Sequence, residues 1–136
     1  MTIMLGGCQC GAVRYEASGE PLFAAHCQCG DCKKSSGAGH VTVAGFQESA
    51  VTFTGATKTY ASKADSGANV RRDFCPACGG RIAFRGDNFA GMVLLTAGSL
   101  DDPSSLKPAA ALYDLRHVEW DYFDPALPRP PGMPPQ

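Results

Sequence analysis

The sequence lacks the features that mark several large classes of protein. No run approaches the roughly 18 apolar residues of a membrane-spanning helix. The first residues contain no basic segment followed by a long apolar one, so we expect no signal peptide and a cytoplasmic location. The 12 basic and 13 acidic residues leave a net charge of −1, without the basic excess typical of nucleic-acid-binding proteins. We therefore expect neither a membrane nor a nucleic acid as a partner.

Sustained helical periodicity is also missing, and so are two common catalytic signatures. The chain has no Ser–His–acid pattern that specifies a hydrolase and no glycine loop with phosphate-binding spacing. Short alternating segments are present instead, separated by turns that the 16 glycines can supply. These segments predict strands at 12–17, 40–45, 50–55, 81–86 and 91–98, with one helical turn after Cys29. We therefore predict a mainly β protein in which residues 1–136 form a single domain.

The C-terminal segment differs from the rest in composition. The stretch DPALPRPPGMPPQ holds six of the ten prolines, which favour extended backbone and cannot build a sheet interior. We expect residues 125–136 to form a proline-rich surface strap or tail. The single tryptophan, Trp120, precedes this segment, and we expect it in the core or in a pocket wall.

Seven cysteines form the most distinctive feature of the chain. An odd number argues against a secreted disulfide framework, and clustered thiols in a reducing compartment indicate metal binding or catalysis. The cysteines fall into three short groups: Cys8 and Cys10, then Cys27, Cys29 and Cys32, then Cys75 and Cys78. Because structural zinc sites use four protein ligands and catalytic sites three, this total suggests one site of each kind.

The first and last groups suit a closed structural site. Cys75 and Cys78 lie in CPACGG, a Cys-x-x-Cys turn, and glycine permits the unusual backbone angles that follow such a turn. Cys8 and Cys10 lie two residues apart in GGCQCG, so in extended backbone their sulfurs point to the same face. We expect these four sulfurs to share one zinc ion. The weaker alternative is four buried cysteines without a metal.

The middle group suits an open site. Cys27, Cys29 and Cys32 can meet at one zinc ion and leave its fourth position for solvent or substrate. Spacing leaves two alternatives open: Cys8 and Cys10 paired with two members of this trio, and an iron–sulfur cluster in place of zinc. A fourth protein ligand, such as the neighbouring His26, would close the site.

A zinc ion with three thiolates has one net negative charge, so it is a poorer Lewis acid than a zinc ion with three histidines. Such an ion still deprotonates a coordinating thiol. The trio therefore suits carbon–sulfur bond chemistry at a thiol better than hydrolysis. Lys33 and Lys34 directly follow the trio and Arg72 lies shortly before Cys75, and these three basic residues are candidate contacts for an anionic thiol such as glutathione.

The order of these motifs resembles the glutathione-dependent formaldehyde-activating enzyme family, abbreviated GFA, which includes centromere protein V. The resemblance rests on GGCQCGAVRYE, HCQCGDCKKSSGAG, RRDFCPACGGRIAF, AGSLDDPSSLKP and VEWDYFDPALPRPPGMP. It implies a β-tent of small antiparallel sheets leaning together around zinc. It also implies two zinc ions per chain, with Cys8, Cys10, Cys75 and Cys78 structural and Cys27, Cys29 and Cys32 catalytic.

The family's named activity joins glutathione and formaldehyde into S-hydroxymethylglutathione and is classed with carbon–sulfur lyases. The resemblance thus predicts a zinc-dependent lyase that acts on a thiol–aldehyde adduct. One residue departs from a common family variant, because Gln28 stands where a histidine is frequent. The alternatives are a non-enzymatic zinc-binding thiol carrier, an interaction module and a redox sensor.

Overall fold

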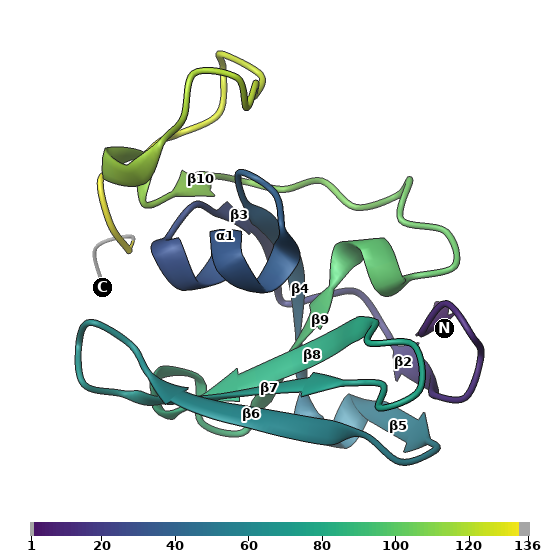
Figure 1. Cartoon of the computed structure of the whole chain (residues 1–136). Helices are drawn as coiled ribbons and strands as arrows, with labels where there is room; N and C mark the ends of the chain where they lie inside the picture. Colours follow the sequence, from purple (N-terminus) through teal and green to yellow (C-terminus); the bar gives the residue numbers. More distant parts are fainter. Residues whose placement is uncertain (1, 134–136) are drawn as a thin grey trace.

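The structure, a computed structural model, describes residues 2–133, which form two β-sheets and one short helix (Figure 1). The small sheet has the order β1-β2-β5, made by Ile3–Gly7, Arg14–Ser18 and Val51–Thr54. The large sheet has the order β10-β3-β4-β9-β8-β7-β6. Its strands are, in that order, Ala111–Leu112, Phe23–Cys27, Val41–Gln47, Met92–Thr96, Arg81–Gly86, Asn69–Phe74 and Lys58–Lys63. The helix α1 is Gly30–Ser36, and the 3-10 turns η1 to η4 are Glu48–Ala50, Asp87–Phe89, Ala97–Ser99 and Asp114–Arg116.

The prediction of a mainly β protein with few helical turns is confirmed. The five predicted strands coincide with β2, β4, β5, β8 and β9, and the predicted helical turn is α1. The sequence did not indicate β1, β3, β6, β7 and β10, which are alanine-rich, glycine-rich, polar or very short. The strand pairs are antiparallel except for the short parallel pair β10–β3 at the edge of the large sheet.

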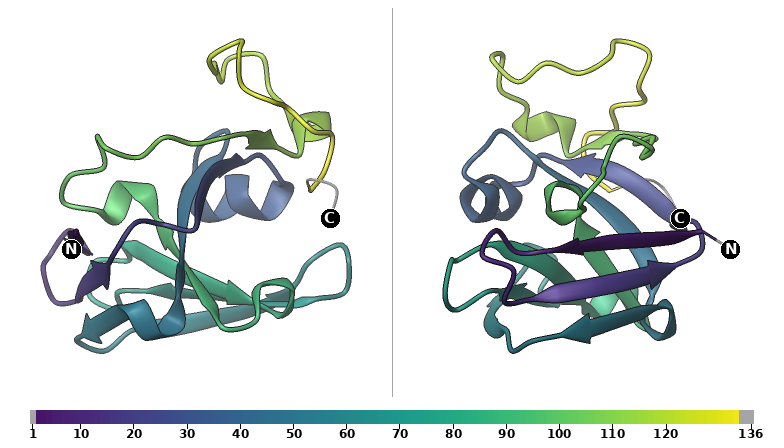
Figure 2. Two further views of the ribbon diagram at one scale, coloured as in Figure 1. Left: turned by 180° about the vertical axis from the view of Figure 1, so that it is seen from behind. Right: turned by 90° about the vertical axis from the view of Figure 1, so that its right-hand side faces the viewer.

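The core lies where the two sheets face each other. In and just before β2, Val13, Tyr15 and Ala17 alternate inward and are fully buried, as strand periodicity requires. The large sheet contributes further buried side chains, among them Phe46 and Leu95. The chain passes from one sheet to the other through η1, which joins β4 directly to β5 (Figure 2). The two sheets are thus parts of one hydrophobic cluster.

The proline-rich segment returns along β10 and η4 at the top of Figure 1. The backbone N–H groups of Ala111, Tyr113 and Asp114 donate to the carbonyl oxygens of Pro128, Gly132 and Pro130 at 2.9, 3.1 and 2.9 Å. Proline has no N–H, but its carbonyl still accepts, so the prolines of this segment can pair only in this sense. The last residues of the predicted strap, 134–136, lie outside the described residues.

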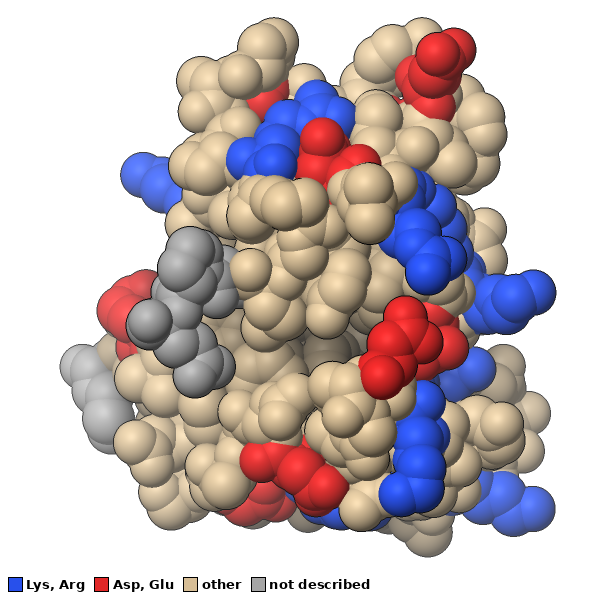
Figure 3. Space-filling model, turned by 90° about the vertical axis from the view of Figure 1, so that its left-hand side faces the viewer, with Lys and Arg blue, Asp and Glu red and all other residues tan. Residues whose placement is uncertain are grey.

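The expectation for Trp120 is wrong, because 67% of this residue is exposed. It lies in the loop between η4 and the returning segment, where no sheet covers it. Within residues 2–133, no helix is long and apolar enough to cross a membrane. Basic and acidic side chains are interspersed on the face shown in Figure 3, and neither sign of charge forms a continuous patch there.

Candidate metal centres and adjoining cleft

The turn from β3 into α1 brings three sulfurs to one point. Cys27 is the last residue of β3, Cys29 is the N-cap of α1 and Cys32 lies in its first turn. The Cys29 Sγ accepts a hydrogen bond from the backbone N–H of Cys32 at 3.4 Å. The three sulfurs all lie within 4.8 Å of one another, and across 2–133 no fourth cysteine, histidine or carboxylate completes this group. We call this group the trio.

The three thiols of the trio have different pKa values. Hydrogen bonds from Cys27 and Cys32 lower the pKa of Cys29, with a smaller contribution from the positive charge of Arg72. The hydrogen bond with Cys29 raises the pKa of Cys27 to about 12, and those with Cys27 and Cys29 raise the pKa of Cys32. The protein alone therefore favours one thiolate held by two thiols. A bound cation would favour deprotonation of all three, because a coordinating thiol is deprotonated outright.

Gln28 points away from the trio. Its side chain is fully buried, and its Oε1 accepts a hydrogen bond from His117 Nδ1 at 2.6 Å. Its Nε2 donates to the Leu112 carbonyl oxygen and to Asp114 Oδ1, both at 3.4 Å. The residue between Cys27 and Cys29 thus anchors the segment after β10. It is not placed to act on a ligand at the trio.

Two hairpin turns bring the other four cysteines together, in a group that we call the tetrad. Cys8 and Cys10 lie between β1 and β2, and Cys75 and Cys78 between β7 and β8. The sulfurs of Cys8 and Cys10 lie 3.6 Å apart, and those of Cys10 and Cys75 lie 3.7 Å apart. Because the first turn belongs to the small sheet and the second to the large one, the tetrad joins the two sheets.

The backbone around the tetrad supports thiolates. The Val13 N–H donates to Cys8 Sγ at 3.2 Å, and this hydrogen bond lowers the pKa of Cys8 to about 6. The Ala77 N–H donates in the same way to Cys75 Sγ at 3.4 Å. Gly79 has a positive φ of 76°, and its N–H closes the turn onto the Cys75 carbonyl oxygen at 2.8 Å. The glycine after the Cys-x-x-Cys turn is therefore required by the backbone, as predicted.

The donor set of both clusters fits a thiophilic cation. Zinc–sulfur bonds of about 2.3 Å in a tetrahedron place neighbouring sulfurs about 3.8 Å apart, close to the two spacings in the tetrad. All seven cysteines are free, and a disulfide would need sulfurs about 2 Å apart. Each cluster could hold one metal ion. The alternative that paired Cys8 and Cys10 with members of the trio is wrong, because the tetrad and the trio are separate groups.

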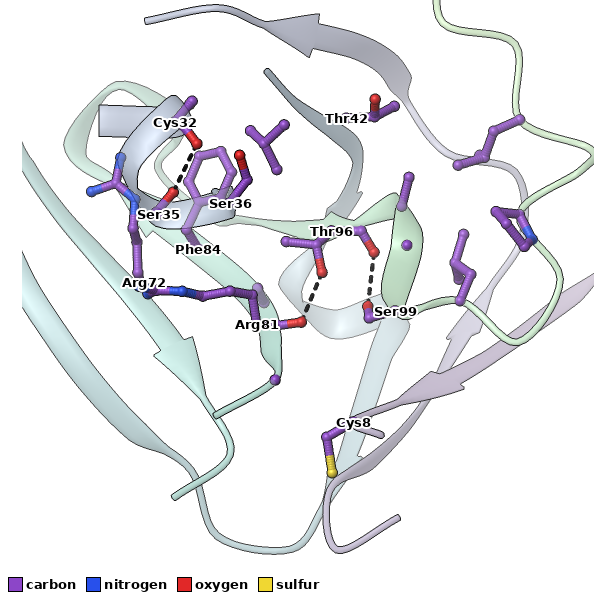
Figure 4. Close-up of a pocket in the computed structure, with 18 of the residues that line it drawn as sticks. Cys8, Cys32, Ser35, Ser36, Thr42, Arg72, Arg81, Phe84, Thr96 and Ser99 are labelled. Atoms are coloured by element: carbon purple, nitrogen blue, oxygen red, sulfur yellow. Dashed lines mark hydrogen bonds between the residues drawn. The ribbon is translucent and has the colours of Figure 1, made fainter. Parts of the chain in front are cut away.

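A cleft of about 860 Å³ runs between the two clusters (Figure 4). Its walls include Cys32 of the trio at one end and Cys8 of the tetrad at the other. Ser36 of α1 and Phe84 of β8 also line it. A volume of this size holds a small organic molecule. A ligand in the cleft would lie against the trio through Cys32.

The three basic residues that were predicted to contact substrate differ in their position relative to the cleft. Arg72 is only 9% exposed and lines the cleft, where it donates from Nη1 to Ser62 Oγ at 3.2 Å. Lys33 instead donates from Nζ to the Arg116 carbonyl oxygen, and Lys34 is exposed. Neither lysine lines the cleft. The prediction that the lysines contact substrate stays a prediction.

His26 does not close the trio. Its Nδ1 lies 2.7 Å from Thr42 Oγ1, and its ring packs against His40 and Phe123 with centroids 4.9 and 4.8 Å away. It is absent from the group of atoms that could share a metal with the trio. In the described structure, the trio thus offers three sulfur atoms to a metal ion and no fourth protein ligand.

Sequence reasoning missed two groups that line the cleft. The first is Arg81, which follows CPACGG and starts β8. The second is His40, whose Nδ1 lies 2.6 Å from Asp121 Oδ2, a residue 81 positions away. The position of Arg81 directly after the CPACGG turn could have indicated it. No sequence pattern indicated the His40–Asp121 pair, because this contact depends on the tertiary fold alone.

The fold and these clusters define a class: a mainly β protein with two cysteine groups that could each hold a metal ion beside a cleft. The model of the family described as glutathione-dependent formaldehyde-activating enzyme matches residues 3–116, and the chain belongs to this family. The match contains all seven cysteines, and the resemblance drawn from the motifs is confirmed. No curated protein matches the chain.

A crystal structure of a Rhodobacter sphaeroides protein from structural genomics is similar in fold. It is 21% identical to this chain, with a TM-score of 0.58, and the match covers 93% of this chain and 99% of that one. At this identity, the likeness supports the fold.

Proposed function

We propose that the protein is a zinc-dependent carbon–sulfur lyase acting on a thiol–aldehyde adduct, with glutathione and formaldehyde as the candidate substrates. The observation that carries this proposal is the trio, a group of three sulfurs without a fourth ligand among the described residues, with Cys32 in the wall of a cleft. Membership of the family supplies the candidate substrates. Clustered free thiols also favour the reducing conditions of the cytoplasm.

Zinc is the metal we propose for both clusters, two ions per chain. Thiolates are soft ligands, and the spacing of the tetrad sulfurs suits the tetrahedral geometry of zinc. The tetrad would hold a structural ion through Cys8, Cys10, Cys75 and Cys78. The trio would hold a catalytic ion through Cys27, Cys29 and Cys32. A zinc ion at the trio would supply deprotonation of a substrate thiol in synthesis and stabilisation of a leaving thiolate in cleavage.

The residues of the chain supply binding and proton transfer. The cleft positions the aldehyde carbon near the trio and restricts the access of water. His40 is the group on the cleft wall that we assign to the proton of the adduct hydroxyl. Its Nδ1 donates to Asp121 Oδ2 at 2.6 Å, which leaves Nε2 as a proton acceptor. In synthesis, the thiolate sulfur bonds to the aldehyde carbon, and His40 passes the proton that the thiol has released to the carbonyl oxygen. Cleavage reverses both steps.

The test is exchange between formaldehyde, glutathione and their adduct, measured by NMR with and without protein that contains two zinc ions. We expect the protein to accelerate exchange, and Cys32→Ser to lose this acceleration together with one zinc ion. The exposed Ser66→Ala is the matched control and should behave as the unmodified protein. Exchange no faster with protein than without it, across a panel of thiols and aldehydes, would contradict the proposal and favour a thiol carrier.

A further inference from the structure

Arg72 is a buried cation without an acidic partner. The residue is 9% exposed, and its side chain contacts Ser62 Oγ and the face of Phe84, with the guanidinium carbon 5.9 Å from the ring centroid. Over residues 2–133, no carboxylate forms a salt bridge with it. A guanidinium has five N–H donors, so two neutral contacts leave most of its capacity unused.

In Arg81, one particular donor atom lacks a hydrogen-bond acceptor. Its Nη1 is buried and has no hydrogen-bond partner, and it is the single buried side-chain nitrogen or oxygen of this kind in the part of the chain that the structure describes. Its guanidinium carbon lies 5.6 Å from the centroid of the Phe74 ring. A buried N–H without an acceptor costs free energy, so such a group needs an explanation in a native fold.

Four arginines, Arg14, Arg85, Arg116 and Arg129, are paired with carboxylates. Arg14 binds Asp101, Arg85 binds Glu48 and Asp73, and Arg129 binds Asp114. Arg72 and Arg81 form no such pair, and both line the cleft, on the same wall in Figure 4. Among the described residues, the one carboxylate on the cleft wall, that of Asp101, is already occupied by Arg14. The cleft therefore presents two unneutralised guanidinium groups on a wall that also includes Cys32.

We propose that Arg72 and Arg81 form a carboxylate-binding subsite that selects thiols carrying a carboxylate. This inference rests on the proposed function and assigns to it the residues that would select the substrate by its carboxylate. A carboxylate accepts two parallel N–H bonds from a guanidinium, and a low-dielectric wall strengthens this interaction. The bound carboxylate would supply the acceptor that Arg81 Nη1 lacks. A thiol whose sulfur lies at the trio would then extend along the cleft from Cys32 to the arginines.

The test measures binding without chemistry, by calorimetry on zinc-containing protein. The probe is S-methylglutathione, whose blocked sulfur cannot react with an aldehyde, and the comparison is the same molecule with both carboxylates esterified. We expect the ester to bind about tenfold or more weakly than the acid. Arg72→Met and Arg81→Met should each weaken binding of the acid by about tenfold or more and leave binding of the ester nearly unchanged.

Arg71→Met is the matched control. Arg71 precedes Arg72 on β7, is exposed and does not line the cleft, so its loss should leave affinity for the acid unchanged. A second readout is thermal unfolding without probe. Removing an unpaired buried charge should leave Arg72→Met and Arg81→Met at least as stable as the unmodified protein. A residue that serves only the fold would instead lower the unfolding temperature.

Equal affinity for acid and ester, or loss of acid binding in Arg71→Met as large as in Arg81→Met, overturns the subsite. If a methionine variant loses zinc, the lysine variant at the same position (Arg72→Lys or Arg81→Lys) replaces it in the test, because lysine retains the charge. Tighter binding of the acid than of the ester by that variant supports the subsite. Equal affinities for acid and ester overturn it. The exchange assay distinguishes the two proposals. Carboxylate-dependent binding without catalysed exchange contradicts the lyase alone, and catalysed exchange without carboxylate preference contradicts the subsite alone.

Discussion

Individual side chains of this protein make specific contacts with residues that are distant in the sequence. Tyr15 is an example: its ring lies in the core of the small sheet, and its hydroxyl and that of Ser99 lie 2.7 Å apart. A Cβ on Gly6 would lie 2.3 Å from the Tyr15 hydroxyl, so only glycine leaves room for this contact. Tyr15 falls within the strand predicted at 12–17, but the sequence gave no indication of Ser99, which is 84 positions away.

Burial raises the pKa of Tyr15 to about 12, and this gives a prediction for alkaline pH. In the unfolded chain a tyrosine ionises near pH 10, so the folded state holds this proton more tightly. The stabilisation is fully present below about pH 10 and is lost as the pH rises toward about 12, by roughly 2–3 kcal/mol. Denaturant unfolding of the unmodified protein and of Tyr15→Phe across this range measures it. A parallel decline in both proteins would contradict the assignment.

At the scale of elements, the short parallel pair β10–β3 depends on a side chain rather than on backbone pairing alone. Gln28, directly after β3, contacts the Leu112 carbonyl at the end of β10 and Asp114 of η4. It also accepts a hydrogen bond from His117. Because two-residue strands pair weakly, this buried amide fixes the segment that follows β10 against the large sheet.

Gln28→Ala should therefore destabilise the protein by about 1–3 kcal/mol, because it leaves buried groups without partners. Hydrogen exchange should become faster at the amides of Leu112 to Arg116 in particular. Gln47→Ala is the matched control, since Gln47 is exposed and its side chain caps nothing, and a change within about 0.5 kcal/mol is expected. Equal effects of the two substitutions would mean that the Gln28 network does not hold this segment.

At the scale of the whole molecule, the tetrad is a side-chain connection between the sheets, in addition to the shared core and η1. It joins the β1–β2 turn to the β7–β8 turn, which are more than 60 residues apart in sequence. The trio, in contrast, is formed within one turn of the large sheet. Metal at the tetrad would therefore stabilise the global fold, and metal at the trio would leave it largely unaffected.

Cys78→Ser and Cys32→Ser should separate these roles. Structural zinc contributes on the order of 10 kcal/mol to folding, comparable with the whole stability of a domain, so Cys78→Ser should be largely unfolded. Cys32→Ser should keep cooperative unfolding while it loses one metal ion. Circular dichroism during heating, with elemental analysis of zinc, measures both. Similar unfolding temperatures for the two variants would contradict this division.

The sequence by itself determined what local backbone geometry controls. Cysteines two or three residues apart must lie near each other, so each pair and the trio were predictable, and the alternation at 12–17 predicted a strand that includes Val13 and Tyr15. The number of cysteines and the family resemblance also predicted that Cys8 and Cys10 meet Cys75 and Cys78, and the structure confirms this grouping over the alternative with the trio. Only the tertiary structure set Asp121 beside His40 and left Arg72 and Arg81 in a cleft without acidic partners. These outcomes depend on strand pairing between distant segments, which leaves no periodic signal in the sequence.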